Sequence, residues 1–123
     1  MNTTAWILQG IIAFVFLMAG SIKATQSKAF IKEKLGPWAD DFSLSTIKSI
    51  GITQILSALG LVVPMLIGKF TFLTPISAII LILIMIGAIY THLGRGEKKE
   101  SVPPFLVIIM LCVVLYIRQG LLF

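Results

Sequence analysis

The chain has 123 residues, of which 58% are hydrophobic, and its mean hydropathy is +1.04. Soluble domains contain about 45–50% apolar residues, so this composition excludes a soluble globular protein and predicts a single membrane domain over residues 1–123. The net charge of +5 does not indicate nucleic-acid binding, because the charges are not interleaved with aromatic residues on a soluble surface.

Four apolar segments are long enough to cross about 30 Å of hydrocarbon at about 1.5 Å per helical residue. We expect these spans at about residues 5–22, 47–67, 72–92 and 102–121, with Arg118 of the last span extending toward the headgroups. Backbone groups in lipid must be paired within each span, so helices are predicted and strands are not. Short connections between them predict an all-α, polytopic membrane protein with an up-down bundle of four transmembrane helices.

The first connection predicts a short helix at the membrane interface. Residues 24–35 alternate lysines with apolar side chains, which is typical of a helix that lies on the bilayer. Gly36 and Pro37 should end this helix, and Asp40, Asp41, Ser43 or Ser45 should cap the next span.

Eight of the ten lysines and arginines lie in or beside the first and third connections. By the positive-inside rule these two connections are cytoplasmic and both termini lie outside. The N-terminus lacks the basic region of a cleaved signal peptide, so we expect the first span to be permanent. The basic face should attract anionic membrane lipid, and docking of a partner is the alternative. The eight residues are Lys23, Lys28, Lys32, Lys34, Lys48, Arg95, Lys98 and Lys99.

Each of the first three spans carries a polar residue on its small-residue face. Small residues let helices approach closely in lipid, so these faces should point into the bundle. Lys23, Gln54 and His92 would then lie at one depth near the cytoplasmic side. Polar groups buried in a membrane indicate a site by default, although helix-ending interface residues and a structural hydrogen-bonded cluster are both alternatives. The expected packing residues are Gly20, Gly51, Ala58 and Ala88, and the residues expected near the polar cluster are Thr53, Tyr90 and Thr91.

Three motifs, Gly20–Lys23, Ile50–Leu61 and Gly87–Leu93, resemble those of the DoxX-like membrane proteins. The resemblance covers nearly the whole chain. The family's Gly-x-x-Lys ending matches Gly20 and Lys23, and its small residue and histidine match Ala88 and His92. Many members carry glutamate where this chain has Gln54, which can neither form an ion pair nor accept a proton, so charge-based chemistry is not expected here.

The resemblance implies a bacterial plasma membrane and an accessory role. Members are associated with a thiosulfate:quinone oxidoreductase, as a membrane subunit, and with complexes that handle thiol or oxidative stress. A eukaryotic receptor-assembly chaperone is similar in its four-helix plan. We therefore expect a non-catalytic accessory or assembly subunit that works with a redox or client membrane protein. A homodimer is physically reasonable.

The alternative is a small-molecule binding protein or enzyme with a pocket in the cytoplasmic half. There His92 would act as donor or base, and Lys23 would face an electron-rich head such as a quinone oxygen. Cys112 is the single cysteine, so disulfide exchange is not expected. One histidine with no cysteine or carboxylate near it predicts no metal site, and no glycine-rich loop indicates a nucleotide site. All five acids lie in connections, which argues against carboxylate-coupled transport.

Overall fold

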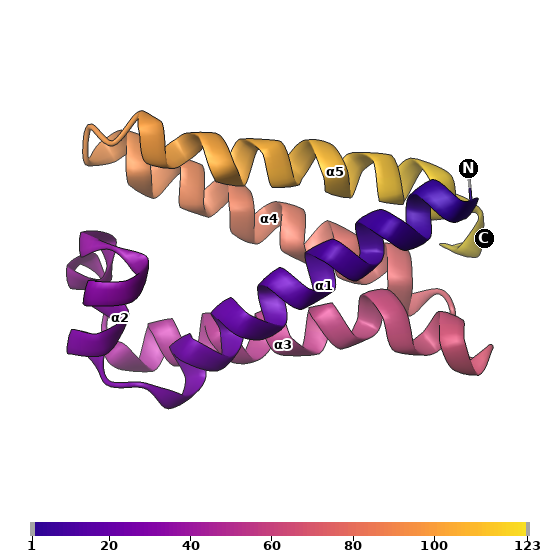
Figure 1. The fold of residues 1–123 in the computed structure, drawn as a ribbon, viewed down its shortest axis with the longest axis horizontal. Coiled ribbons are helices and arrows are strands. Elements are labelled where there is room, and N and C mark those ends of the chain that lie inside the picture. Colours follow the sequence, from indigo (N-terminus) through magenta and orange to yellow (C-terminus); the bar gives the residue numbers. More distant parts are fainter. Residues whose placement is uncertain (1, 123) are drawn as a thin grey trace.

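The computed structural model describes residues 2–122, and all its regular elements in that range are helical (Figure 1). The long helices are α1 (Asn2–Thr25), α3 (Leu44–Ile67), α4 (Leu73–Gly94) and α5 (Val102–Arg118). Shorter segments are α2 (Lys28–Leu35), η1 (Pro37–Asp41), η2 (Lys99–Ser101) and η3 (Gln119–Leu122). Four stretches, one of them running from η2 through η3, are long and apolar enough to cross a membrane. The predicted all-α bundle of four transmembrane helices is confirmed.

The helices pack as two pairs that meet along the bundle. α1 lies mainly against α3 and α4 against α5, while α3–α4 and α1–α5 contacts join the two pairs (Figure 1). One end, which we call the terminal end, contains the start of α1, the α3–α4 turn and η3. The opposite end, which we call the basic end, contains α2, η1 and the α4–α5 connection.

The ends of the four long helices differ from the predicted bounds by up to three residues, and local capping accounts for several of these differences. α3 begins at Leu44, since the Ser43 side chain accepts a hydrogen bond from the Thr46 backbone N–H. In the first connection, α1 continues to Thr25, and a separate helix begins at Lys28 after the Ser27 cap. The predicted single helix over residues 24–35 was therefore too long at its start.

Close approach of α1 and α3 depends on two glycines. A Cβ atom on Gly20 would lie 2.7 Å from the Gly51 carbonyl oxygen, and one on Gly51 would lie 2.7 Å from the Gly20 carbonyl oxygen. Because real Cβ atoms do not approach oxygen so closely, any side chain here would push the helices apart. Ala58, further along α3, is 1% exposed in the core, and Ala88 of α4 packs against that core.

All four long helices contribute to the main apolar core. Leu61, Leu81, Leu111 and Val114 are fully buried at its centre. A second, smaller cluster joins α2 and η1 to the start of α3 through Ile31, Ala39 and Ile47, each also fully buried. The first connection is therefore a folded cap on the basic end of α1 and α3.

Candidate functional site

Lys23 and Gln54 form a hydrogen bond between α1 and α3. The ammonium nitrogen Nζ donates to Oε1 of Gln54 at 2.9 Å, and Gln54 is 1% exposed. Gly51 permits this geometry because the Lys23 Cβ would lie 2.7 Å from a Cβ atom at residue 51. The ammonium also lies 5.5 Å from the centre of the Trp38 ring, within the range of a cation–π contact. The neutral amide thus holds the lysine as an acceptor, without an ion pair.

His92 is bonded within its own connection. Its Nδ1 lies 2.8 Å from Oε1 of Glu97, and the two side chains are 15% and 19% exposed. After α4 ends, Gly96 adopts a left-handed φ of 74°, and the Glu97 backbone N–H bonds the His92 carbonyl at 2.8 Å. This turn folds Glu97 back onto the histidine. The expectation of no carboxylate near His92 was therefore wrong.

Arg95 links this turn to the first connection. Its Nη1 donates to Oδ1 of Asp41 at 2.8 Å, and its Nε donates to Oε2 of Glu97 at 3.4 Å. Hydrogen bonds from His92 and then Arg95 lower the pKa of the Glu97 carboxyl below its ordinary value. The bond to Asp41 raises the pKa of the Arg95 guanidinium. The four side chains form one network that crosses the basic end.

Among residues 2–122, no three histidine, cysteine or acidic side chains gather closely enough to hold a metal ion.

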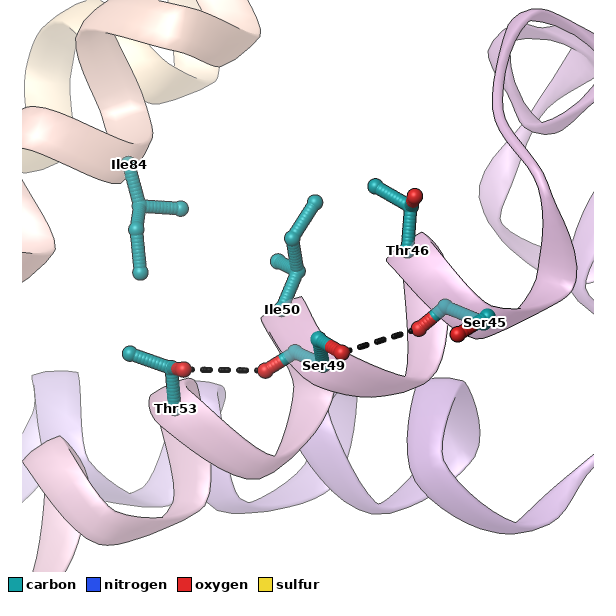
Figure 2. A pocket seen from close by; sticks show the side chains of 6 residues that line it. All are labelled: Ser45, Thr46, Ser49, Ile50, Thr53 and Ile84. Atoms are coloured by element: carbon teal, nitrogen blue, oxygen red, sulfur yellow. Dashed lines mark hydrogen bonds between the residues drawn. The ribbon is translucent and has the colours of Figure 1, made fainter.

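The other three predicted residues line two cavities that are open to the outside of the bundle. A cavity of about 300 Å³ lies between α3 and Ile84 of α4, and Thr53 is part of its wall. Figure 2 shows hydroxyls along α3 beside this space, with Ser49 and Thr53 bonded to α3 carbonyls four residues earlier. The full lining is Ser45, Thr46, Ser49, Ile50, Thr53 and Ile84.

A second cavity, of about 390 Å³, lies nearer the basic end and includes Tyr90 and Thr91 in its wall. Tyr90 is 81% exposed, and the Thr91 hydroxyl donates to the Gly87 carbonyl at 2.9 Å. Its lining is Asp41, Phe42, Tyr90, Thr91, Gly94 and Arg95. Lys23, Gln54 and His92 line neither of these two cavities. The six residues predicted as one cluster therefore divide among four local environments.

A family model described as the DoxX-like family matches residues 7–115. The chain belongs to the DoxX-like family. No curated protein and no solved structure matched it. The matched residues of this DoxX-like chain include both the Lys23–Gln54 bond and His92.

A second polar cluster in this DoxX-like protein was missed by the sequence analysis. Gln9 is fully buried, and its side-chain amide donates to the Leu61 carbonyl. Arg118 Nε donates to Oε1 of Gln9 at 2.9 Å, and the guanidinium lies 5.8 Å from the centre of the Trp6 ring. Arg118 therefore bonds inside the bundle, contrary to the expectation that it extends to the headgroups. Gln9 is a lone amide among apolar residues, which was the available signal.

Pro64 explains a further bond in this half of the DoxX-like fold. Proline has no N–H, so the Gly60 carbonyl four residues earlier loses its helical partner. The Thr74 hydroxyl of α4 donates to that carbonyl at 3.1 Å. Replacement by a neighbouring hydroxyl is how a buried backbone group is satisfied in lipid.

Proposed function

We propose that this DoxX-like protein is a non-catalytic accessory or assembly subunit of a membrane complex, with a redox complex as the first candidate. The Lys23–Gln54 bond is the observation that carries this proposal. The Lys23 ammonium nitrogen and the Gln54 amide oxygen lie 2.9 Å apart and join α1 to α3. Neither residue lines either of the two cavities described above. Gln9 and Arg118 likewise join α1, α3 and α5. Polar groups used in this way fix the helix arrangement that a partner would recognise.

The outer surface gives such a partner room to bind. In the apolar window of α5, 17% of residues are buried inside the bundle, against 33% in each of the other three spans. Helices associate in lipid through close side-chain packing, not through a hydrophobic force. Because α5 has the smallest share of residues packed inside the bundle, it is the helix on which we expect a partner to pack.

The test is recovery of the protein from its own membranes under gentle extraction, followed by native mass spectrometry. We expect a membrane protein at fixed stoichiometry with the wild type. Val113→Trp on the outer face of α5 should release that partner, whereas Leu56→Trp on the exposed face of α3 should retain it. Recovery of the chain without any protein partner, in detergent and in lipid nanodiscs, would refute the subunit role.

Small-molecule binding is the second candidate, and the two cavities favour it. Thr53, Tyr90 and Thr91 line them, and the His92–Glu97 pair lies in the same part of the fold. A lipophilic molecule such as a quinone is the expected occupant. A small molecule that is retained by the wild type and lost in His92→Ala would support this role, while equal retention by both proteins would separate His92 from it.

We place the protein in a bacterial plasma membrane with its basic end in the cytoplasm. The three lysines of α2 and the two lysines of the α4–α5 connection lie at the same end of the bundle. This asymmetry supports the orientation that the positive-inside rule assigns.

A further inference from the structure

The two cavities lie at successive levels of the bundle. Charged side chains line the one nearer the basic end, whereas hydroxyls and two isoleucines line the other. Arg95, which directly follows the last residue of α4, lines the cavity nearer the basic end. Ile84 lines the deeper cavity, and it precedes Arg95 by eleven residues, or about 16 Å of helix. Hydroxyls of α3 lie between these levels. The order of charged groups, hydroxyls and isoleucines is that of a phospholipid, from head through glycerol to acyl chain.

Both signs of charge are present at the mouth. Asp41 and Arg95 are bonded at 2.8 Å, yet their side chains remain 42% and 28% exposed. Arg95 uses Nη1 and Nε for its two carboxylate partners, and its guanidinium has a third nitrogen, Nη2. The carboxylate of Asp41 has further lone pairs. An ammonium and a phosphate joined in one head can therefore lie antiparallel over this pair.

Two aromatic side chains complete the mouth. Tyr90 and Phe42 line the same cavity as the ion pair, and aromatic faces attract an ammonium group. A tyrosine one turn inside the end of a span is also typical of headgroup depth. An anionic head would meet the Asp41 carboxylate, so the cavity favours a zwitterion even though the basic end as a whole carries excess positive charge.

We propose that the two cavities hold one zwitterionic phospholipid from the surrounding leaflet. Its ammonium binds Asp41, its phosphate binds Arg95, and its glycerol region lies along the hydroxyls of Ser49 and Thr53. The beginning of an acyl chain packs against Ile84. This assignment rests on the ligand-binding candidate above and names its ligand class.

The experiment uses the full chain in mixed micelles that contain equal amounts of phosphatidylethanolamine and phosphatidylglycerol, with native mass spectrometry as the readout. The wild type should retain phosphatidylethanolamine preferentially. In Asp41→Asn this preference should fall by about tenfold, which corresponds to loss of one charge-assisted hydrogen bond. Equal retention of the two lipids by the wild type would overturn the proposal.

Asp40→Asn is the matched control. This substitution removes the same charge one residue away from Asp41. Asp40, however, pairs with Lys32 at 2.8 Å and is absent from the cavity lining. The lipid preference of this variant should equal that of the wild type. An equal loss of preference in Asp40→Asn and Asp41→Asn would show that only net surface charge matters and would overturn the proposal.

A second variant guards against misfolding of Asp41→Asn. Ile84→Trp fills the deeper cavity, where the acyl chain is expected to pack, and leaves the ion pair intact. Total lipid retention should fall about fivefold while the ethanolamine preference of the remaining lipid stays. Unchanged retention in this variant would contradict the lipid assignment.

The outcomes also separate this proposal from the functions above. A retained small molecule without lipid would overturn the lipid assignment and leave ligand binding in place. If neither a small molecule nor a lipid is recovered, the lipid assignment and the ligand-binding role are both overturned. The subunit role would still be judged by recovery of a protein partner.

Discussion

At the scale of single residues, the Lys23–Gln54 hydrogen bond can be tested with two substitutions at Gln54. Gln54→Leu keeps similar volume but leaves the Lys23 ammonium without its acceptor, so we expect a loss of stability of about 1–3 kcal/mol. Gln54→Glu retains an acceptor and should unfold at a temperature no lower than Gln54→Leu does. Thermal unfolding in detergent measures both, and equal midpoints for wild type and Gln54→Leu would contradict the role of this bond.

Glu97 gives a pH dependence with a definite sign. Its pKa is lowered from 4.5, first by the His92 hydrogen bond and then by Arg95. A carboxyl with a lowered folded-state pKa contributes stability above its unfolded pKa and loses that contribution as pH falls through the folded value. Protection of the Glu97 backbone amide in hydrogen exchange should therefore drop below about pH 4.5 in the wild type.

Glu97→Gln cannot titrate, so its protection should start lower and be nearly flat across the same pH range. Asp40 is unchanged in both proteins, and its own lowered pKa cancels in the comparison. Parallel pH profiles for wild type and Glu97→Gln would exclude Glu97 as the titrating group.

The sequence predicted Lys23 and Gln54 on small-residue faces that point into the bundle. The structure brings the two side chains together because Gly20 and Gly51 allow α1 and α3 to approach closely. The sequence could not pair His92 with Glu97, since that contact depends on the left-handed turn at Gly96. Gly96 follows the end of the predicted third span by four residues. Reading it as a helix C-terminal glycine would have brought Glu97 near the last turn of α4.

At the scale of helices, the α1–α3 crossing should respond sharply to one methyl group. Gly51→Ala places a Cβ 2.7 Å from the Gly20 carbonyl oxygen and from the Lys23 Cβ, so we expect a loss of about 2–4 kcal/mol as the helices separate. Gly87→Ala is the control, because no atom outside its own helix lies within 4 Å of the added Cβ. That variant should gain about 0.5–1 kcal/mol from helix propensity. Equal unfolding midpoints for the two variants would refute the close crossing.

The Pro64 break and the Thr74 hydroxyl should be energetically coupled. Thr74→Val leaves the Gly60 carbonyl without a donor and should cost about 1–2 kcal/mol. In a Pro64→Ala background, the new N–H at residue 64 can bond that carbonyl, so the same threonine change should cost about 1 kcal/mol less. Additive effects in this double-mutant cycle, measured by unfolding, would show that the hydroxyl does not replace the missing helical bond.

Helix number and order could be predicted from the sequence. A run of about 20 uncharged residues in lipid must pair its own backbone groups, and a helix is the structure that does so within one segment. Helix ends were less predictable. Serine caps and the continuation of α1 to Thr25 shifted them, and these are local hydrogen-bonding choices that hydrophobic length does not encode.

At the scale of the whole molecule, orientation in the membrane is the property to establish. In a Cys112→Ser background, cysteines introduced at Lys28 and Lys98 should resist an impermeant thiol reagent added outside intact cells, because both positions belong to the basic end. A cysteine at Lys69, in the α3–α4 turn, should react and serves as the positive control. Labelling at residues 28 and 98 from outside would reverse the orientation.

Side-chain hydrogen bonds at the terminal end join all four long helices. At the terminal end, Gln9, Thr74 and Arg118 tie helices together, and Gly60 lies against the Ser77 hydroxyl. These bonds link α1 with α3, α3 with α4 and α1 with α5. A cut in either connection of the basic end would therefore leave all four long helices bonded to one another at the terminal end.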